Sequence, residues 1–228
     1  MNLIITCEHA GNQVPEHYNH LFSHIKDILD SHRGYDPGAL EVARFLATEY
    51  SAPLFICETT RLLIEPNRSL DNHQLYSEYS KKLCETDHEQ ILQRYYYPHR
   101  NGVEDVIAKL TKPVLHLSIH TFTPVLDGNE RRVDLGLLFD PDRKTEVEFC
   151  GRLMDGLEHM LPGLRIEFNE PYKGTDDGFT TYLRTKFSER DYLGIEIEIN
   201  QKFLRTEKWE LISVCLKEVL FDLLYQAE

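Results

Sequence analysis

The stretch that most constrains the fold is an apolar run, Val114-Leu-His-Leu-Ser-Ile-His120, which then breaks into Thr121-Phe-Thr-Pro124. A run of this make-up is typical of a strand buried on both faces, as in a parallel sheet covered by helices. Open α/β sheets bind their ligands at the carboxyl ends of such strands. We therefore expect His120 to lie at the rim of a sheet, beside a ligand.

Further apolar runs alternate with helical patterns along the chain. We expect strands at residues 2–7, 53–57, 133–139, 164–168 and 193–199, and a short extended segment at 61–68. We expect helices from an N-cap at Asp36 to Tyr50, from Thr86 through residues 95–97, and over 103–110, 145–160 and 206–225. This alternation predicts an α/β fold with a mainly parallel or mixed sheet.

The composition indicates a globular protein without a membrane segment. The chain has 228 residues, 41% of them hydrophobic and 28% charged, which suits one α/β domain over residues 1–228. It contains no run of about eighteen apolar residues that would span a membrane. Neither the first residues nor the five scattered cysteines suggest secretion, so we expect reduced thiols and a cytoplasmic location.

The charge balance restricts the partners. A net charge of −13 argues against general nucleic-acid binding, which needs clustered Lys and Arg. It still permits a small anionic substrate held by a few local arginines. The sequence does not indicate an oligomeric state.

His9 and His120 each follow a predicted core strand, so both should reach the same edge of the sheet. Two such histidines could share a divalent metal, and imidazole ligands favour zinc. The alternative is that each histidine merely hydrogen-bonds a loop carbonyl. The spacing alone leaves both readings open.

A catalytic zinc commonly has three protein ligands and one open position. Asp36 is the best candidate for the third ligand, because a helix N-cap at a sheet rim can face the same crevice. A plain N-cap is the alternative role for this residue. Glu8 is adjacent to His9, but if the strand continues its side chain points the other way.

Other polar side chains stand where a substrate could bind. Glu198 lies on an otherwise apolar strand. A buried carboxylate there is energetically costly, and a role as general base in catalysis would account for its presence. The alternative is an exposed edge strand with Glu196 and Glu198 facing solvent. Arg61, Asn67 and Arg68 could hold a substrate carboxylate, or the arginines could form surface salt bridges.

Six motifs, in order from residue 7 to residue 200, together resemble the N-formylglutamate amidohydrolase family. They are Cys7-Glu-His-Ala-Gly-Asn-Gln-Val-Pro15, Asp36-Pro-Gly-Ala39, Arg61-Leu-Leu-Ile-Glu-Pro-Asn-Arg68, His120-Thr-Phe-Thr-Pro124, Asn169-Glu-Pro-Tyr-Lys-Gly174 and Ile197-Glu-Ile-Asn200. The family is related to the zinc carboxypeptidases and the aspartoacylase-like deacylases. The resemblance implies a three-layer α/β/α fold with a mixed, mostly parallel sheet, of the phosphorylase/hydrolase and zinc exopeptidase type.

The resemblance also implies roles for individual residues. His9 and His120 match the two zinc histidines, and Glu198 matches the glutamate that acts as general base and then as acid. Asn67 and Arg68 match the pair that holds a substrate carboxylate. Arg61 matches an arginine that polarises the scissile carbonyl.

This sequence departs from the peptidase relatives at one ligand. They have a zinc-binding glutamate three residues after the first histidine, where this chain has Asn12. Asp36, which matches an aspartate common in the family, is the substitute. Glu65 stands where the family usually has aspartate.

The hypothesis from sequence is a zinc-dependent amidohydrolase, with one Zn²⁺ per chain, that removes a small acyl group from an anionic N-acyl amino acid. N-formylglutamate is one example of such a substrate. Two alternatives stay open: a metallopeptidase acting on a peptide or cell-wall fragment, and a non-catalytic small-molecule binding protein of the same fold.

Overall fold

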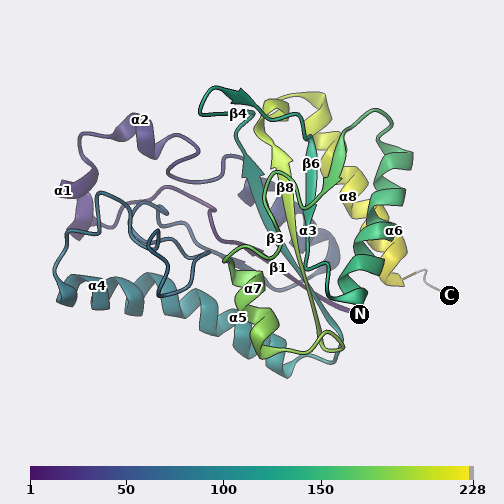
Figure 1. The fold of residues 1–228 in the computed structure, drawn as a ribbon, viewed down its shortest axis with the longest axis horizontal. Coiled ribbons are helices and arrows are strands. Elements are labelled where there is room, and N and C mark those ends of the chain that lie inside the picture. The colour runs from purple at the N-terminus through teal and green to yellow at the C-terminus, as the bar shows by residue number, and fades with distance from the viewer. Residues whose placement is uncertain (226–228) are drawn as a thin grey trace.

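A six-stranded sheet runs through the centre of the computed structural model, which describes residues 1–225 (Figure 1). Its strand order is β2-β1-β3-β8-β6-β7, and every neighbouring pair is parallel except β6 and β8. The strands are β1 (Asn2–Cys7), β2 (Leu54–Ile56), β3 (Val114–Phe122), β6 (Leu135–Leu138), β7 (Ile166–Phe168) and β8 (Tyr192–Asn200). The prediction of a mixed, mostly parallel sheet is confirmed.

Helices cover both faces of the sheet and complete the predicted three-layer α/β/α arrangement (Figure 1). Three helices pack on one face: α3 (Ala39–Tyr50), α6 (Lys144–Met160) and α8 (Glu207–Tyr225). The opposite face carries α5 (Tyr97–Lys109) and α7 (Phe179–Lys186). Residues 226–228 of the domain expected over 1–228 lie outside the described residues, and its extent stays a prediction.

Alternation along the two central strands separates the core from the polar face. Leu115, Leu117 and Ile119 of β3 and the odd-numbered residues 193–199 of β8 all join the large core under α3, α6 and α8. The even-numbered residues of both strands point to the other face. Because β8 lies between β3 and β6, the edge-strand alternative for Glu196 and Glu198 is wrong.

Smaller elements surround the sheet. Two short helices, α1 (Asn19–Phe22) and α2 (Lys26–Leu29), precede α3, and a two-stranded hairpin joins β4 (Val125–Leu126) to β5 (Asn129–Glu130). Among residues 1–225, none of the helices is both long and apolar enough to cross a membrane.

Three local predictions were wrong. Helix α3 begins at Ala39 after Gly38 in a left-handed conformation (φ 88°), so Asp36 is not its N-cap. Helix α4 (Glu85–Ile91) begins one residue before Thr86, and a π-helical stretch joins it to α5. Residues 61–68 form turns, not an extended strand, because Leu62, Leu63 and Ile64 bury themselves in a second apolar cluster.

Gly38 tests how tightly the segment before α3 is packed. A Cβ at this position would lie 2.5 Å from Leu204 and 2.6 Å from Trp209, at a φ that disfavours side chains. We expect Gly38→Ala to lower the free energy of unfolding by roughly 2–4 kcal/mol, combining overpacking and backbone strain. Gly163→Ala is the control, since Gly163 also has positive φ but open space around it. Equal losses in urea unfolding would contradict the packing argument.

Candidate active site

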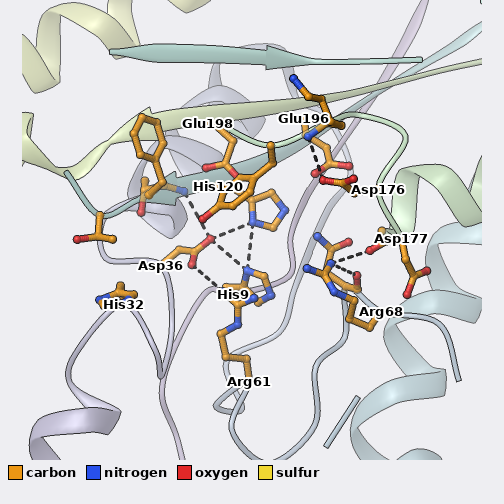
Figure 2. Close-up of a pocket in the computed structure, with 17 residues that line it drawn as sticks. His9, His32, Asp36, Arg61, Arg68, His120, Asp176, Asp177, Glu196 and Glu198 are labelled. Carbon is orange, nitrogen blue, oxygen red and sulfur yellow. Dashed lines mark hydrogen bonds and ion pairs between the residues drawn. The ribbon is translucent and has the colours of Figure 1, made fainter. Parts of the chain in front are cut away.

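A pocket opens at the carboxyl ends of the parallel strands β1, β3 and β8 (Figure 2). Its walls contain every residue that the sequence analysis assigned to chemistry: His9, Asp36, Arg61, Asn67, Arg68, His120 and Glu198. The loop after β7 forms the opposite wall with Tyr172, Lys173 and residues 176–178. The position agrees with the expectation that ligands bind where parallel strands end.

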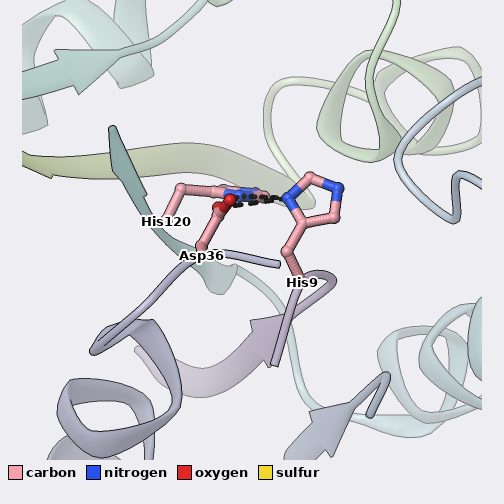
Figure 3. A group of neighbouring side chains, drawn as sticks. All are labelled: His9, Asp36 and His120. Carbon is pink, nitrogen blue, oxygen red and sulfur yellow. Dashed lines mark hydrogen bonds and ion pairs between the residues drawn. The ribbon is translucent and has the colours of Figure 1, made fainter. Parts of the chain in front are cut away.

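Three acceptor atoms converge at the centre of this pocket (Figure 3). Nδ1 of His9 lies 3.1 Å from Nδ1 of His120 and 3.1 Å from Oδ2 of Asp36. Nδ1 of His120 lies 2.9 Å from the same Oδ2. All three side chains are buried. Within residues 1–225 neither histidine bonds a loop carbonyl, which was the alternative reading of their roles.

Each histidine uses its other nitrogen to contact a buried carboxylate. Nε2 of His9 donates to Glu65 at 2.5 Å, and Nε2 of His120 lies 3.2 Å from Glu8 and 2.9 Å from Ser118 Oγ. A proton on each Nε2 leaves a lone pair on each Nδ1. Two lone pairs and a carboxylate then face one another, an arrangement that is repulsive unless a cation lies among them.

The three atoms fit a tetrahedral metal. Bonds of about 2.0–2.1 Å to nitrogen and oxygen place tetrahedral ligand atoms roughly 3.3 Å apart, close to the separations of His9, Asp36 and His120. Carboxylate partners behind ligand histidines are the usual support of such sites. The described residues thus contain a possible metal site with two histidines and one carboxylate.

Without a metal, protonation supplies the positive charge. Burial lowers the pKa of His120, but hydrogen bonds to Asp36 and Glu8 override this effect and hold it well above its usual value. Burial raises the pKa of Asp36, yet the neighbouring histidines and Arg61 hold it well below its usual range. The pocket therefore keeps Asp36 ionised and ready to bind a cation.

Asn12 does not belong to this site. Its side-chain amide donates 3.0 Å hydrogen bonds to the Leu29 carbonyl and to Asp30. Asp36 reaches the two histidines instead, held by a backbone hydrogen bond from its N–H to the His9 carbonyl. Asp36, and not Asn12, is therefore the candidate for the third ligand.

Glu8 and Glu65 are functional candidates that the sequence reasoning missed. Glu8 continues the polar face of β1, on which Thr6 is the register partner of Ser118, and its fully buried carboxylate reaches the far nitrogen of His120 and also binds His99 and Ser118. Burial raises the pKa of Glu8, but its hydrogen bonds to the two histidines hold it well below the usual range. A carboxylate next to a strand-end histidine was the available signal. Glu65 contacts His9 across 56 positions, which local patterns do not reveal.

Glu198 lies beside His120, its direct partner in the register of β3 and β8. Its side chain is 5% exposed, and no described residue hydrogen-bonds its Oε2. Burial raises its pKa to about 8; the charge of His120 opposes this shift, and the charges of Asp36 and Glu196 add to it. An unpartnered carboxylate with a raised pKa at a pocket wall is suited to accepting and returning a proton.

The three remaining predicted residues lie around this centre. Arg61 binds Glu65 and reaches Asp36 at 3.3 Å, which uses three of its five N–H groups. Asn67 accepts from the Phe179 N–H at 2.6 Å, so its amide nitrogen is free to face the pocket. Nη1 of Arg68 donates to the carbonyls of Asn67 and Asp177, leaving its other nitrogens for a ligand.

Comparison with known proteins identifies the family. The family model of N-formylglutamate amidohydrolase matches residues 1–205. The chain belongs to the N-formylglutamate amidohydrolase family. Membership supports a hydrolase that acts on amide bonds, and the resemblance drawn from the six motifs is confirmed.

Solved structures agree with this assignment. With 27% identity and a TM-score of 0.81, the chain is similar to a gene product of Agrobacterium tumefaciens, over 97% of this chain and 91% of that one. Its fold also matches an N-formylglutamate amidohydrolase from Ralstonia eutropha JMP134 (17% identity, TM-score 0.65), over 98% of this chain and 92% of that one. A search of curated proteins found no match.

The raised pKa of Glu198 predicts a pH dependence of stability for the metal-free protein. The folded protein holds this proton up to about pH 8, whereas the unfolded chain loses it near pH 4.3. Glu198 therefore contributes stability below that lower value, and the contribution is lost as the pH rises toward 8. Relative to wild type, Glu198→Gln should gain up to roughly 1.4 kcal/mol of unfolding free energy per pH unit in this window.

Chemical unfolding at pH 5, 7 and 9 measures this difference. Glu148→Gln removes the same charge from an exposed position on α6 and should give a flat difference across the range. A flat difference for Glu198→Gln would show that the carboxylate is not held neutral in the folded protein.

The contact between Glu8 and His120 predicts that Glu8 affects the affinity for zinc. Removing its charge in Glu8→Gln weakens the acceptor for Nε2 of His120, so the ring is less well oriented and a poorer ligand. We expect zinc to bind roughly 10- to 100-fold more weakly, as for other partners of ligand histidines. Competition with a chromophoric chelator measures the affinity. His88→Ala, at a histidine outside the pocket, is the control and should bind zinc like wild type.

Proposed function

We propose that this protein is a zinc-dependent amidohydrolase that removes a small acyl group, formyl or similar, from an N-acyl amino acid. One observation carries the proposal: the acceptor atoms of His9, Asp36 and His120 converge beside the unpartnered carboxylate of Glu198. Family membership supports the reaction class, the hydrolysis of an amide bond. The metal and the substrate are parts of the proposal.

His9, Asp36 and His120 would hold the metal. Zinc at these residues would act as a Lewis acid toward the acyl carbonyl and lower the pKa of water at the site. Glu65 and Glu8 fix the two imidazole rings from behind, so their Nδ1 atoms stay directed inward. The buried position of all three ligands keeps competing water away.

Glu198 is the proposed proton carrier. Its free Oε2 would take a proton from the attacking water and return it to the leaving amine. A pKa raised by burial favours both steps, because the carboxyl group must bind and release the proton near neutral pH. A nearby zinc ion would lower this pKa and favour the base form before attack.

The arginines and Asn67 would orient the substrate. Arg68 and the amide of Asn67 present free donors for the carboxylate of an N-acyl amino acid. Arg61 has unused N–H groups at the pocket and would stabilise charge developing on the carbonyl oxygen. An acidic protein can thus bind an anion, because its donors are concentrated in one pocket.

Two variants test the proposal together. Protein purified without a histidine tag should contain about one zinc per chain in wild type, and His120→Ala should contain almost none. Glu198→Gln should keep the metal and bind substrate, while turnover of N-formyl amino acids falls roughly 10²- to 10⁴-fold. Metal analysis, calorimetry and amine release measure these three quantities.

The control is Glu148→Gln, which should match wild type throughout. Absence of zinc in wild type, even after incubation with zinc at neutral pH, would overturn the metal-dependent mechanism. Turnover retained in Glu198→Gln would remove Glu198 from the mechanism.

A further inference from the structure

Glu196 is a second buried carboxylate in the pocket, and the proposed reaction does not use it. It lies two residues before Glu198 on the same face of β8 and is 8% exposed. The strand rise places the two side chains about 7 Å apart. Figure 2 shows Glu196 on the side of the pocket near Asp176, away from Asp36.

The carboxylate of Glu196 has one side-chain hydrogen-bond partner among the described residues. Its hydrogen bond within the described residues is to Oγ1 of Thr180, through Oε1. No lysine, arginine or histidine among residues 1–225 lies within ion-pair distance of it. The charge of Glu196 acts on Arg184 only from beyond ion-pair distance, so the carboxylate can still pair with a positively charged ligand in the pocket.

Several cations around the pocket are paired with other groups. Arg61 pairs with Asp36 and Glu65, and Lys173 pairs with Glu170. Arg184 of α7 binds Glu146 and the carbonyls of Gly174 and Gly194. These pairings leave Glu196 as a buried pocket carboxylate with no ion pair among residues 1–225 and no role in the proposed reaction. Asp176 also lines the pocket, but it is exposed and accepts a hydrogen bond from the Lys173 N–H. Asp177, by contrast, binds Ser69 and Asn72.

Glu196 also lies next to the proposed carboxylate site. A Cβ added to Gly178 would be 3.3 Å from Oε1 of Glu196 and 3.4 Å from Oδ1 of Asn67. The two side chains therefore flank the same glycine, with Arg68 nearby through its hydrogen bond to Asp177. One end of the pocket thus offers donors for an anion and an acceptor for a cation.

We propose that Glu196 forms a subsite for an ammonium group, so that the substrate is an N-acylated basic amino acid with both a carboxylate and a cation. This inference rests on the proposed amidohydrolase function and narrows its substrate class. A second carboxylate, as in N-formylglutamate, would face Glu196 and be repelled. The cation can be the side-chain ammonium of an Nα-acyl substrate or the α-ammonium of an Nε-acyl one.

Four substrates of similar size test the charge. Zinc-loaded wild type is assayed with Nα-formyl-lysine, Nε-formyl-lysine, N-formylnorleucine and N-formylglutamate. We expect kcat/KM for one lysine isomer to exceed that for the norleucine compound by roughly 10- to 100-fold, as for a hydrogen bond to a charged group. The favoured isomer tells which ammonium Glu196 binds. Equal rates for lysine and norleucine compounds, or a preference for N-formylglutamate, would overturn the subsite.

Variants assign the preference to Glu196. Glu196→Gln keeps an oxygen to accept from Thr180 but loses the charge, so the ratio of lysine to norleucine rates should fall toward one. Glu148→Gln makes the same change on α6, outside the pocket, and should keep the wild-type ratio. An unchanged ratio in Glu196→Gln would contradict the assignment.

Binding separates this inference from the proposed reaction. Calorimetry with free lysine, norleucine and glutamate needs no turnover. Lysine binding that depends on Glu196, in a protein that hydrolyses no formyl amino acid, would uphold the subsite and overturn the amidohydrolase proposal. Turnover of formyl amino acids without any preference for a cation would uphold the amidohydrolase proposal and overturn the subsite. Failure in both assays would overturn both.

Discussion

The site depends on one electrostatic condition: the lone pairs of His9 and His120 and the carboxylate of Asp36 point at a common centre. Their mutual repulsion is relieved only by positive charge, whether protons or a metal. The surrounding groups enforce this convergence. Glu65 and Glu8 hold the far nitrogens, and Arg61 holds the second oxygen of Asp36. Rotating any one ring would leave a buried carboxylate without its partner, so the inward direction is fixed from outside.

The fold provides this arrangement through the alternation of two central strands. On β3 and β8 every second side chain joins the apolar core. The side chains between them point to the other face, where polar residues can form the site although both strands are buried throughout. The register then pairs His120 with Glu198 and Ser118 with Glu196. A shift of one residue would move the isoleucines into the pocket and the glutamates into the core. The same periodicity therefore fixes both the stability of the sheet and the relative positions of ligand and base.

Periodicity also explains what the sequence could predict. The strands and the strand-end position of His120 follow from patterns within a few residues, and they were found. The same pattern left open whether Glu198 is buried or faces solvent on an edge strand, because alternation does not tell where a strand lies in the sheet. Asp36 was recognised, but its capping role was wrong because Gly38 adopts positive φ and delays the helix. Glu65 was out of reach, since its contact with His9 depends on how turns at 61–68 fold back. Glu8 was misjudged because β1 ends at Cys7. Alternation places Glu8 on the polar face with Ser118, whereas His9 lies beyond the strand, where alternation no longer sets the direction of its side chain.

The pocket carboxylates connect function to stability. Glu198 and Glu196 are buried on one strand without cations, and Asp36 is balanced by groups that a metal would replace. A buried negative charge gives the site an affinity for a group that would neutralise it. The carboxylate at the metal centre attracts a divalent cation, the one beside it attracts a proton, and the one at the far end attracts an ammonium group. Three carboxylates in one cavity thus acquire different roles from their partners, because Asp36 has two imidazoles, Glu198 borders the metal centre, and Glu196 borders the donors that hold the substrate.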